Sequence, residues 1–124
     1  MFDHVEFSVG DITSARALYG GIVKAVGGGE AFFDADGKEL GLGKDDVVTL
    51  LLFEGKPTKP PMHLCFQATS KDAVIAGHAS ALAAGGTCNG PPGYRDHYAP
   101  GYFAAFIHDQ DGHNVELLYR EPQP

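Results

Sequence analysis

YFAAFIHDQDGHNVELLYR, residues Tyr102–Arg120, contains two apolar runs on either side of a short polar turn. The Asp111-Gly112 pair suits a turn that requires positive φ, so the stretch predicts a β-hairpin. Glu116 interrupts the second apolar run, where a carboxylate costs several kcal/mol unless a partner or a metal ion compensates its charge. Glu116 therefore either lies in water on an edge strand or belongs to a site, depending on what the other strands place opposite it.

The composition indicates one acidic globular domain, residues 1–124. Nine Lys and Arg stand against 16 Asp and Glu, giving a net charge of −7, and 44% of the residues are hydrophobic. This charge argues against nucleic acid or an acidic membrane surface as a partner. No apolar run approaches the roughly 20 residues that span a bilayer. With no signal segment visible at the N-terminus, we expect a cytoplasmic protein with Cys65 and Cys88 reduced.

The first half of the chain predicts the order strand, helix, strand, strand, strand. Residues 2–9 alternate, with Val5, Phe7 and Val9 on one face. Asp11 can cap a helix over Ile12–Val26, whose apolar residues follow helical spacing and which ends at three glycines. The three short strands that follow are expected at residues 30–35, 39–43 and 48–53.

The same order returns after a proline-containing linker at residues 56–61. It comprises a strand at Met62–Ala68, a helix from Lys71 to about Ala84 capped by Ser70, a short strand at Thr87–Asn89, a long loop at Gly90–Pro100, and the final hairpin. The chain is therefore predicted to be an α+β protein made of two tandem βαβββ modules, 1–55 and 62–121. Paired edge to edge, the modules would form a curved mixed sheet with the helices on its outer face.

The faces turned away from the helices carry the candidate metal ligands. Alternation places His4 and His63 at equivalent positions of the two repeats, 63 − 4 = 59 residues apart, and Glu116 on the matching face of the closing strand. Two imidazoles and one carboxylate suit a divalent ion such as Fe, Mn, Ni, Co or Zn. The remaining histidines are expected to be ordinary exposed or hydrogen-bonded residues: His78, His97, His108 and His113.

The repeat resembles the vicinal oxygen chelate superfamily, which includes glyoxalase I, extradiol dioxygenases, fosfomycin-resistance enzymes and bleomycin-resistance proteins. Three motifs carry the resemblance: DHVEFSV at residues 3–9, MHLCF at 62–66 and DQDGHNVE at 109–116. The resemblance implies metal ligation by His4, His63 and Glu116. In glyoxalase I a fourth ligand comes from the last strand of the first module, where this chain has Leu50 or its neighbour. Leucine cannot ligate a metal, which argues against glyoxalase I activity.

The resemblance leaves two classes of function open. The first is a metal-dependent dioxygenase, lyase or transferase acting on a small substrate that chelates the ion through neighbouring oxygens. The second is a protein that binds a small molecule or antibiotic without catalysis, as bleomycin-resistance proteins do. Either the modules close one cup within a chain, or His4 of one chain meets His63 and Glu116 of another in a homodimer.

The loop before the hairpin and the hairpin itself supply candidate substrate contacts. Positive and aromatic side chains there could orient an anionic or aromatic substrate, and a long loop rich in Pro and Gly could act as a lid. The candidate substrate-binding residues are Arg95, His97, Tyr98, Tyr102 and Phe106. Of these, Tyr102 is also the candidate catalytic group.

Overall fold

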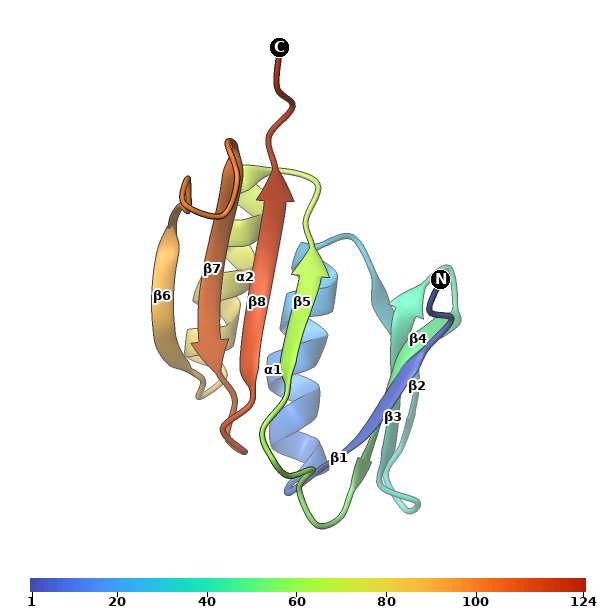
Figure 1. The fold of residues 1–124 in the computed structure, drawn as a ribbon. Helices are drawn as coiled ribbons and strands as arrows, with labels where there is room; N and C mark the ends of the chain where they lie inside the picture. Colours follow the sequence, from blue (N-terminus) through green and yellow to red (C-terminus); the bar gives the residue numbers. More distant parts are fainter.

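The computed structural model describes all 124 residues and contains two helices and eight strands (Figure 1). The elements of the first half are β1 (Val5–Val9), α1 (Ile12–Ala25), β2 (Gly29–Asp34), β3 (Glu39–Lys44) and β4 (Val47–Glu54). Those of the second half are β5 (His63–Gln67), α2 (Lys71–Ala83), β6 (Thr87–Tyr94), β7 (Tyr102–His108) and β8 (Asn114–Arg120). The predicted tandem βαβββ modules and the α+β class are confirmed.

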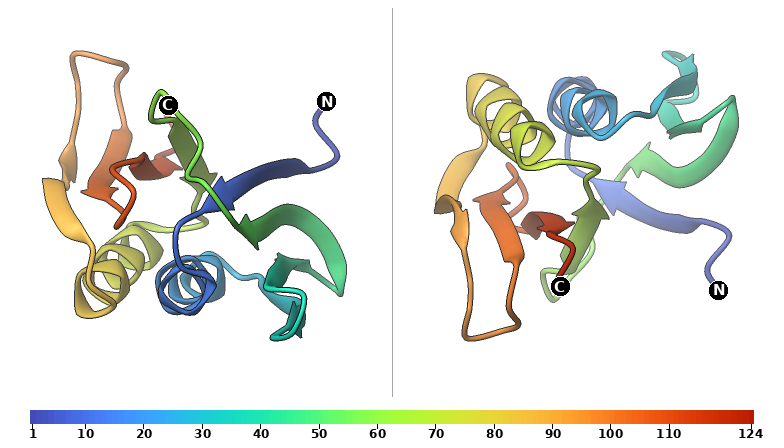
Figure 2. Two further views of the ribbon diagram at one scale, coloured as in Figure 1. Left: turned by 90° about the horizontal axis from the view of Figure 1, so that it is seen from below. Right: turned by 90° about the horizontal axis from the view of Figure 1, so that it is seen from above.

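Each module forms its own four-stranded mixed sheet. The strand orders are β1-β4-β3-β2 and β5-β8-β7-β6, so the first strand of each module pairs in parallel with its last strand. No backbone ladder joins the two sheets. The predicted curved surface therefore consists of two separate sheets. In the end-on views the two sheets diverge from each other on the side opposite the helices (Figure 2).

The two helices pack against each other and each covers its own sheet, so both modules share one hydrophobic core. The predicted caps are present: Asp11 accepts a hydrogen bond from the Ser14 N–H, and Ser70 accepts one from the Ala73 N–H. Leu18 and Ile22 of α1 are fully buried, as is Leu117 of β8. Because core residues of both modules contact one another, the spacing between the modules is fixed by packing rather than by the linker.

The segment predicted as a loop at Gly90–Pro100 is partly a strand. β6 continues to Tyr94, and only residues 95–101 connect it to β7. Pro91 and Pro92 are tolerated because β6 is an edge strand, whose outer side needs no N–H donors, and because its pairing with β7 shifts register on both sides of Gly90. At the other end of the chain, the predicted strand 2–9 begins only at Val5.

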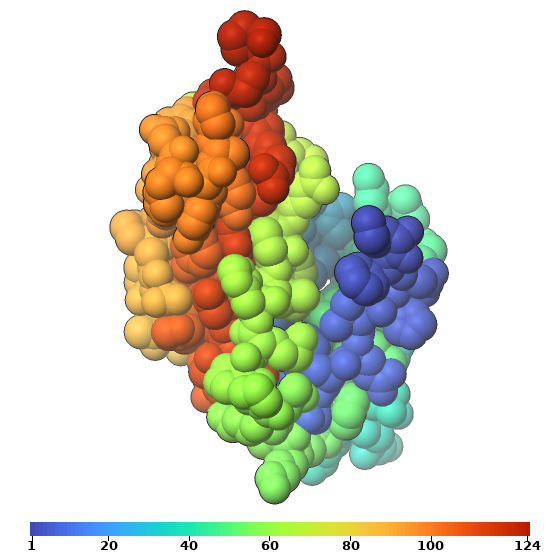
Figure 3. Space-filling model, in the orientation of Figure 1, coloured from blue at the N-terminus to red at the C-terminus, as the bar shows by residue number.

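A furrow separates β5 from β1 on the face shown in the space-filling view (Figure 3). It runs between the two modules on the side opposite the helices. Neither helix has the length and hydrophobicity that a membrane-spanning helix needs.

Candidate functional site

Glu116 lies at the centre of the second sheet, with its carboxylate buried on the face turned away from α2. β8 is flanked by β5 and β7, and the residues level with Glu116 are Cys65 and Phe106. Glu116 is only 3% exposed. Its surroundings rule out the edge-strand interpretation, in which the carboxylate would be solvated.

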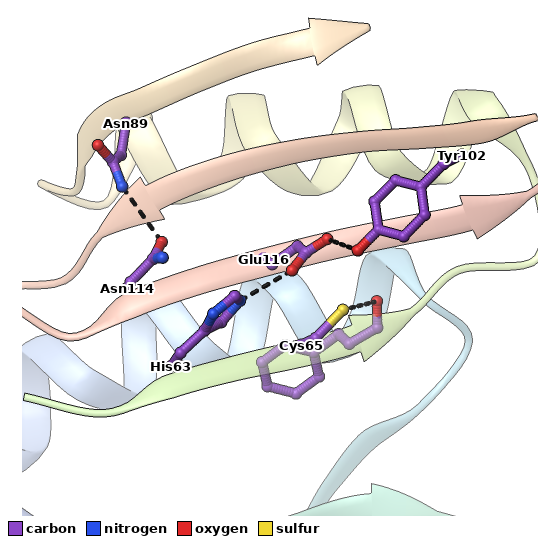
Figure 4. Close-up of polar contacts among 7 residues, drawn as sticks. His63, Cys65, Asn89, Tyr102, Asn114 and Glu116 are labelled. Atoms are coloured by element: carbon purple, nitrogen blue, oxygen red, sulfur yellow. Dashed lines mark hydrogen bonds and ion pairs between the residues drawn. The ribbon is translucent and has the colours of Figure 1, made fainter. Parts of the chain in front are cut away.

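Two side chains hydrogen-bond to this carboxylate (Figure 4). His63 Nε2 lies 2.8 Å from Oε1, and the Tyr102 hydroxyl donates to Oε2 over 2.5 Å. The His63 imidazole is half exposed, with 52% of its side chain accessible, and it meets the Phe106 ring edge to face at 6.2 Å. One side of the imidazole–carboxylate pair is therefore buried and the other is open to solvent.

The proton-bearing neighbours of Glu116 keep their protons at neutral pH. Loss of water around the sulfur, together with the Glu116 charge, raises the pKa of the Cys65 thiol to about 12. Burial and the hydrogen bond to Glu116 raise the pKa of Tyr102 as well. Negative charge at this point of the sheet is thus confined to the carboxylate.

His4 is remote from this pair. Its imidazole is exposed and hydrogen-bonds to Asp3 over 2.7 Å. It precedes β1, whose opposite end reaches the turn before β8, where the Gly10 N–H donates to Asp111. About 20 Å of extended chain separates His4 from Gly10. The structure therefore brings His63, Glu116 and Tyr102 together and leaves His4 at the far end of the other sheet.

The register of the first module identifies the counterpart of Glu116. In the second module Cys65 of the first strand pairs with Glu116 of the last strand, and in the first module the equivalent pair is Glu6 and Leu51. Leu50 instead points into the core and is 4% exposed. Of the two positions that the sequence allowed, Leu50 or its neighbour, the counterpart of Glu116 is therefore the neighbour, Leu51. Because it is apolar, the first module brings no carboxylate to this place.

A hollow of about 310 Å³ lies beside His63, whose register partner is Asn114. Its lining combines polar and aromatic residues: Asn89, Gly90, Arg95, Tyr98, Phe106 and Asn114. The Arg95 guanidinium lies 5.4 Å from the Phe106 ring centroid and donates to the carbonyl oxygens of Pro91 and Gly93. The hollow thus holds one fixed positive charge next to the candidate metal ligands.

Some lining residues were predicted and others were not. Arg95, Tyr98 and Phe106 line the hollow, and Tyr102 contacts Tyr98 and Glu116 beside it. His97 does not line the hollow; its ring contacts the Tyr98 ring at a tilt. The sequence analysis missed Asn89 and Asn114, whose side chains hydrogen-bond over 3.2 Å (Figure 4). Asn114 could have been found by period two, because it stands two residues before Glu116 and so faces the same side.

A second cluster of possible ligand atoms lies in the turn before β8, where Asp109, Asp111 and His113 approach within 4.8 Å. The Asp109 carboxylate already accepts from the Tyr19 hydroxyl and from the N–H groups of Asp111 and His113. His113 Nδ1 accepts from the Met62 N–H, which leaves the proton on Nε2, a buried atom without a hydrogen-bond partner. A protonated nitrogen cannot ligate a metal, so we interpret this cluster as the structural link between the modules.

Comparison with known proteins gives one family match. The family model described as Glyoxalase/Bleomycin resistance protein/Dioxygenase superfamily matches residues 1–117. No curated protein matches the chain. Among solved structures, a glyoxalase/bleomycin resistance protein from Albidiferax ferrireducens is 28% identical, with a TM-score of 0.80 over 97% of this chain and 99% of that chain.

Two more distant structures share the fold. A glyoxalase/bleomycin resistance protein/dioxygenase family enzyme from Burkholderia phytofirmans is 17% identical, with a TM-score of 0.71 over 97% of this chain and 98% of that one. The fosfomycin resistance protein FosX from Listeria monocytogenes is 19% identical, with a TM-score of 0.68 over 95% and 88%; its structure contains manganese(II) and a dihydroxypropylphosphonic acid.

Proposed function

Because the chain belongs to the glyoxalase/bleomycin resistance protein/dioxygenase superfamily, we propose that it is a divalent-metal-dependent enzyme acting on a small substrate with neighbouring oxygen atoms. The observation that carries the proposal is the pair formed by His63 and Glu116. A buried carboxylate that meets a half-exposed imidazole beside a hollow is suited to holding a metal ion that a substrate can reach.

The donor atoms of this pair fit a first-row divalent ion. Metal bonds of about 2.1 Å to nitrogen and oxygen place neighbouring ligand atoms roughly 3 Å apart. The 2.8 Å between His63 Nε2 and Glu116 Oε1 is close to this value. Tyr102, which donates to the second carboxylate oxygen, would hold the carboxylate in this orientation.

The third ligand in the proposal is His4 of a second copy of the chain. Within one chain His4 lies at the far end of β1 from the start of β5, and no group of three possible ligand atoms includes it. Its exposed imidazole, preceding an edge strand, is free to approach another molecule. In a symmetric dimer the same contact would occur twice, giving two sites.

An ion held by His63 and Glu116 would supply Lewis acidity, which favours negative charge on a substrate oxygen. The residues of the chain orient the substrate. Arg95 offers its positive charge to an anionic group seated in the hollow, and Phe106 offers an apolar surface between Arg95 and His63. Tyr102 keeps its proton and its hydrogen bond to Glu116, so it acts as a positioning residue rather than a base.

Metal content tests the proposal. Untagged protein is expected to hold about one divalent ion per chain (Fe, Mn, Ni, Co or Zn), and Glu116→Gln and His63→Ala are expected to lose it. His108→Ala is the matched control, because His108 lies in the same sheet without contacting Glu116. Full binding of ion by Glu116→Gln would refute the proposed centre.

Mixing two variants tests the sharing of the site. His4→Ala and Glu116→Gln proteins are each expected to lack bound metal. After random exchange of subunits, one site of every mixed dimer combines an intact His4 with an intact His63 and Glu116, so about a quarter of all sites recover metal. If one chain held the whole site, mixing would restore none.

Assays with candidate substrates are needed to identify the class of reaction. Metal-loaded protein can be assayed for oxygen uptake with catechols, for isomerisation of the hemithioacetal of glutathione and a 2-oxoaldehyde, and for opening of a phosphonate epoxide. Ligand binding that persists with a chelator, without turnover of any of these, would favour the alternative of a non-catalytic binding protein.

A further inference from the structure

We propose that Cys88 and His78 form a thiol–imidazole pair that makes Cys88 a site of thiol–disulfide exchange with small disulfides. His78 Nε2 lies 3.3 Å from Cys88 Sγ, which is hydrogen-bonding distance for sulfur. The pair joins the middle of α2 to edge strand β6. A nucleophile within reach of a base is the arrangement that activates a thiol.

The two partners differ in exposure in the way this reaction requires. His78 is 7% exposed, and Cys88 Sγ is the only partner with which its side chain hydrogen-bonds. Cys88 is an exposed free cysteine, so a small disulfide can reach it. The base is thus sheltered and fixed while the nucleophile is open to solvent.

Burial also keeps the base in its neutral form. It lowers the pKa of His78, so the imidazole is unprotonated at neutral pH and one of its ring nitrogens is free to accept a hydrogen bond. The elements packed on α2 are α1, β6, β7 and β8. Their charged and titratable side chains form no hydrogen bond or ion pair with the imidazole, leaving Cys88 as its one polar side-chain contact.

This pair is distinct from the candidate metal centre. Cys88 is level with Ile107 and Val115, which are fully buried on the helix side of the sheet, whereas Glu116 faces the opposite side. The separation excludes a disulfide between Cys88 and Cys65. Cys65 lies on the far edge strand β5, three strand spacings or about 14 Å away.

The proposed step is balanced without any further reactant. The thiol proton of Cys88 passes to His78 Nε2 as the sulfur attacks one sulfur of the disulfide. A new S–S bond forms to Cys88, the original S–S bond breaks, and the departing thiolate takes the proton back from His78. The products are a protein mixed disulfide and one small thiol.

Exchange with bis(2-hydroxyethyl) disulfide, followed by mass spectrometry, tests the proposal. This probe is uncharged, so the net charge of −7 does not bias its approach. The Cys65→Ala protein reports Cys88 alone, and the Cys88→Ala protein identifies any reaction at Cys65. For each thiol we compare the exchange rate at pH 7 with the exchange rate at pH 10. The ratio of these two rates does not depend on how easily the probe reaches the sulfur, so Cys88 can be compared with a cysteine peptide.

An ordinary thiol with a pKa of about 8.5 is about 3% ionised at pH 7, so a cysteine peptide should give a ratio of about 0.03. We expect the ratio for Cys88 to be about tenfold higher, and His78→Gln or His78→Asn to return it to the peptide value with the pH 10 rate unchanged. A peptide-like ratio in the Cys65→Ala protein would overturn the proposal. So would a high ratio that survives both His78 variants. If neither variant folds, the comparison with the peptide decides alone.

Discussion

Tyr19 of α1 donates a 2.5 Å hydrogen bond to Asp109 in the turn before β8, across 90 residues of sequence and between the two modules. Tyr19 is 1% exposed and Asp109 is 6% exposed. Burial and the neighbouring carboxylate raise the pKa of Tyr19, so its hydroxyl keeps its proton and remains a donor at neutral pH and above. In the same turn, the Asp111 carboxylate accepts a hydrogen bond from the Gly10 N–H. The turn is therefore fixed to the first module by two hydrogen bonds, from Tyr19 and from Gly10.

Tyr19→Phe should lower the free energy of unfolding by about 2 kcal/mol. The substitution removes one hydrogen bond to a charged group and leaves a buried oxygen of Asp109 without that donor. Urea unfolding followed by circular dichroism gives the value. Tyr119→Phe is the matched control, because Tyr119 is half-buried and its hydroxyl makes no hydrogen bond; it should change stability by less than about 0.5 kcal/mol.

Alanine should have opposite effects at two helical glycines. A Cβ at Gly77 of α2 would lie 2.3 Å from Leu117 Cδ2, whose side chain is fully buried, so Gly77→Ala should destabilise by roughly 1–3 kcal/mol. A Cβ at Gly20 of α1 meets nothing within 4 Å, so Gly20→Ala should stabilise by about 0.5–1 kcal/mol. The same urea experiment measures both. Equal effects at the two sites would contradict the close packing of α2 on β8.

The stability of the protein should fall on acidification through His78. Burial lowers its pKa in the folded state, so between the folded and unfolded pKa values the unfolded chain binds more protons. The stability contributed by neutral His78 is therefore present above the unfolded value of about 6.5 and is lost as pH falls below it. Melting temperatures at pH 7.5 and 5.0 should differ less in His78→Gln than in the unaltered protein. His97→Gln, at an exposed position, should leave the difference as it is.

The repeat and the faces of its strands could be predicted because they follow from local patterns. Alternation from Val5 to Val9, the caps at Asp11 and Ser70 and the polar turn before Val115 each specify one element. The family resemblance, taken from three short motifs, is confirmed by the match over residues 1–117.

The extent of β6 and the role of the Asp109 turn could not be predicted, because neither is local. Pro91 and Pro92 indicate a loop unless β6 is known to be an edge strand. Nothing near Asp109 in the sequence indicates that Tyr19 is its partner. The distance of His4 from Glu116 also depends on non-local contacts. A repeat predicts which residues lie on equivalent faces, but the packing of the two modules decides which of these residues come together.

Tyr102→Phe should weaken metal binding at the proposed centre by about tenfold or more while leaving the fold intact. The phenol donates to Glu116 Oε2, and removing a group that orients a ligating carboxylate typically costs 10–100-fold in metal affinity. Titration of metal-free protein with Mn(II), followed by calorimetry, measures the loss. Tyr98→Phe is the matched control, because Tyr98 lies beside Tyr102, is itself exposed, and has a hydroxyl that makes no hydrogen bond. If the two variants bind Mn(II) equally well, Tyr102 does not position Glu116 for metal binding, and its contact with the carboxylate only stabilises the sheet.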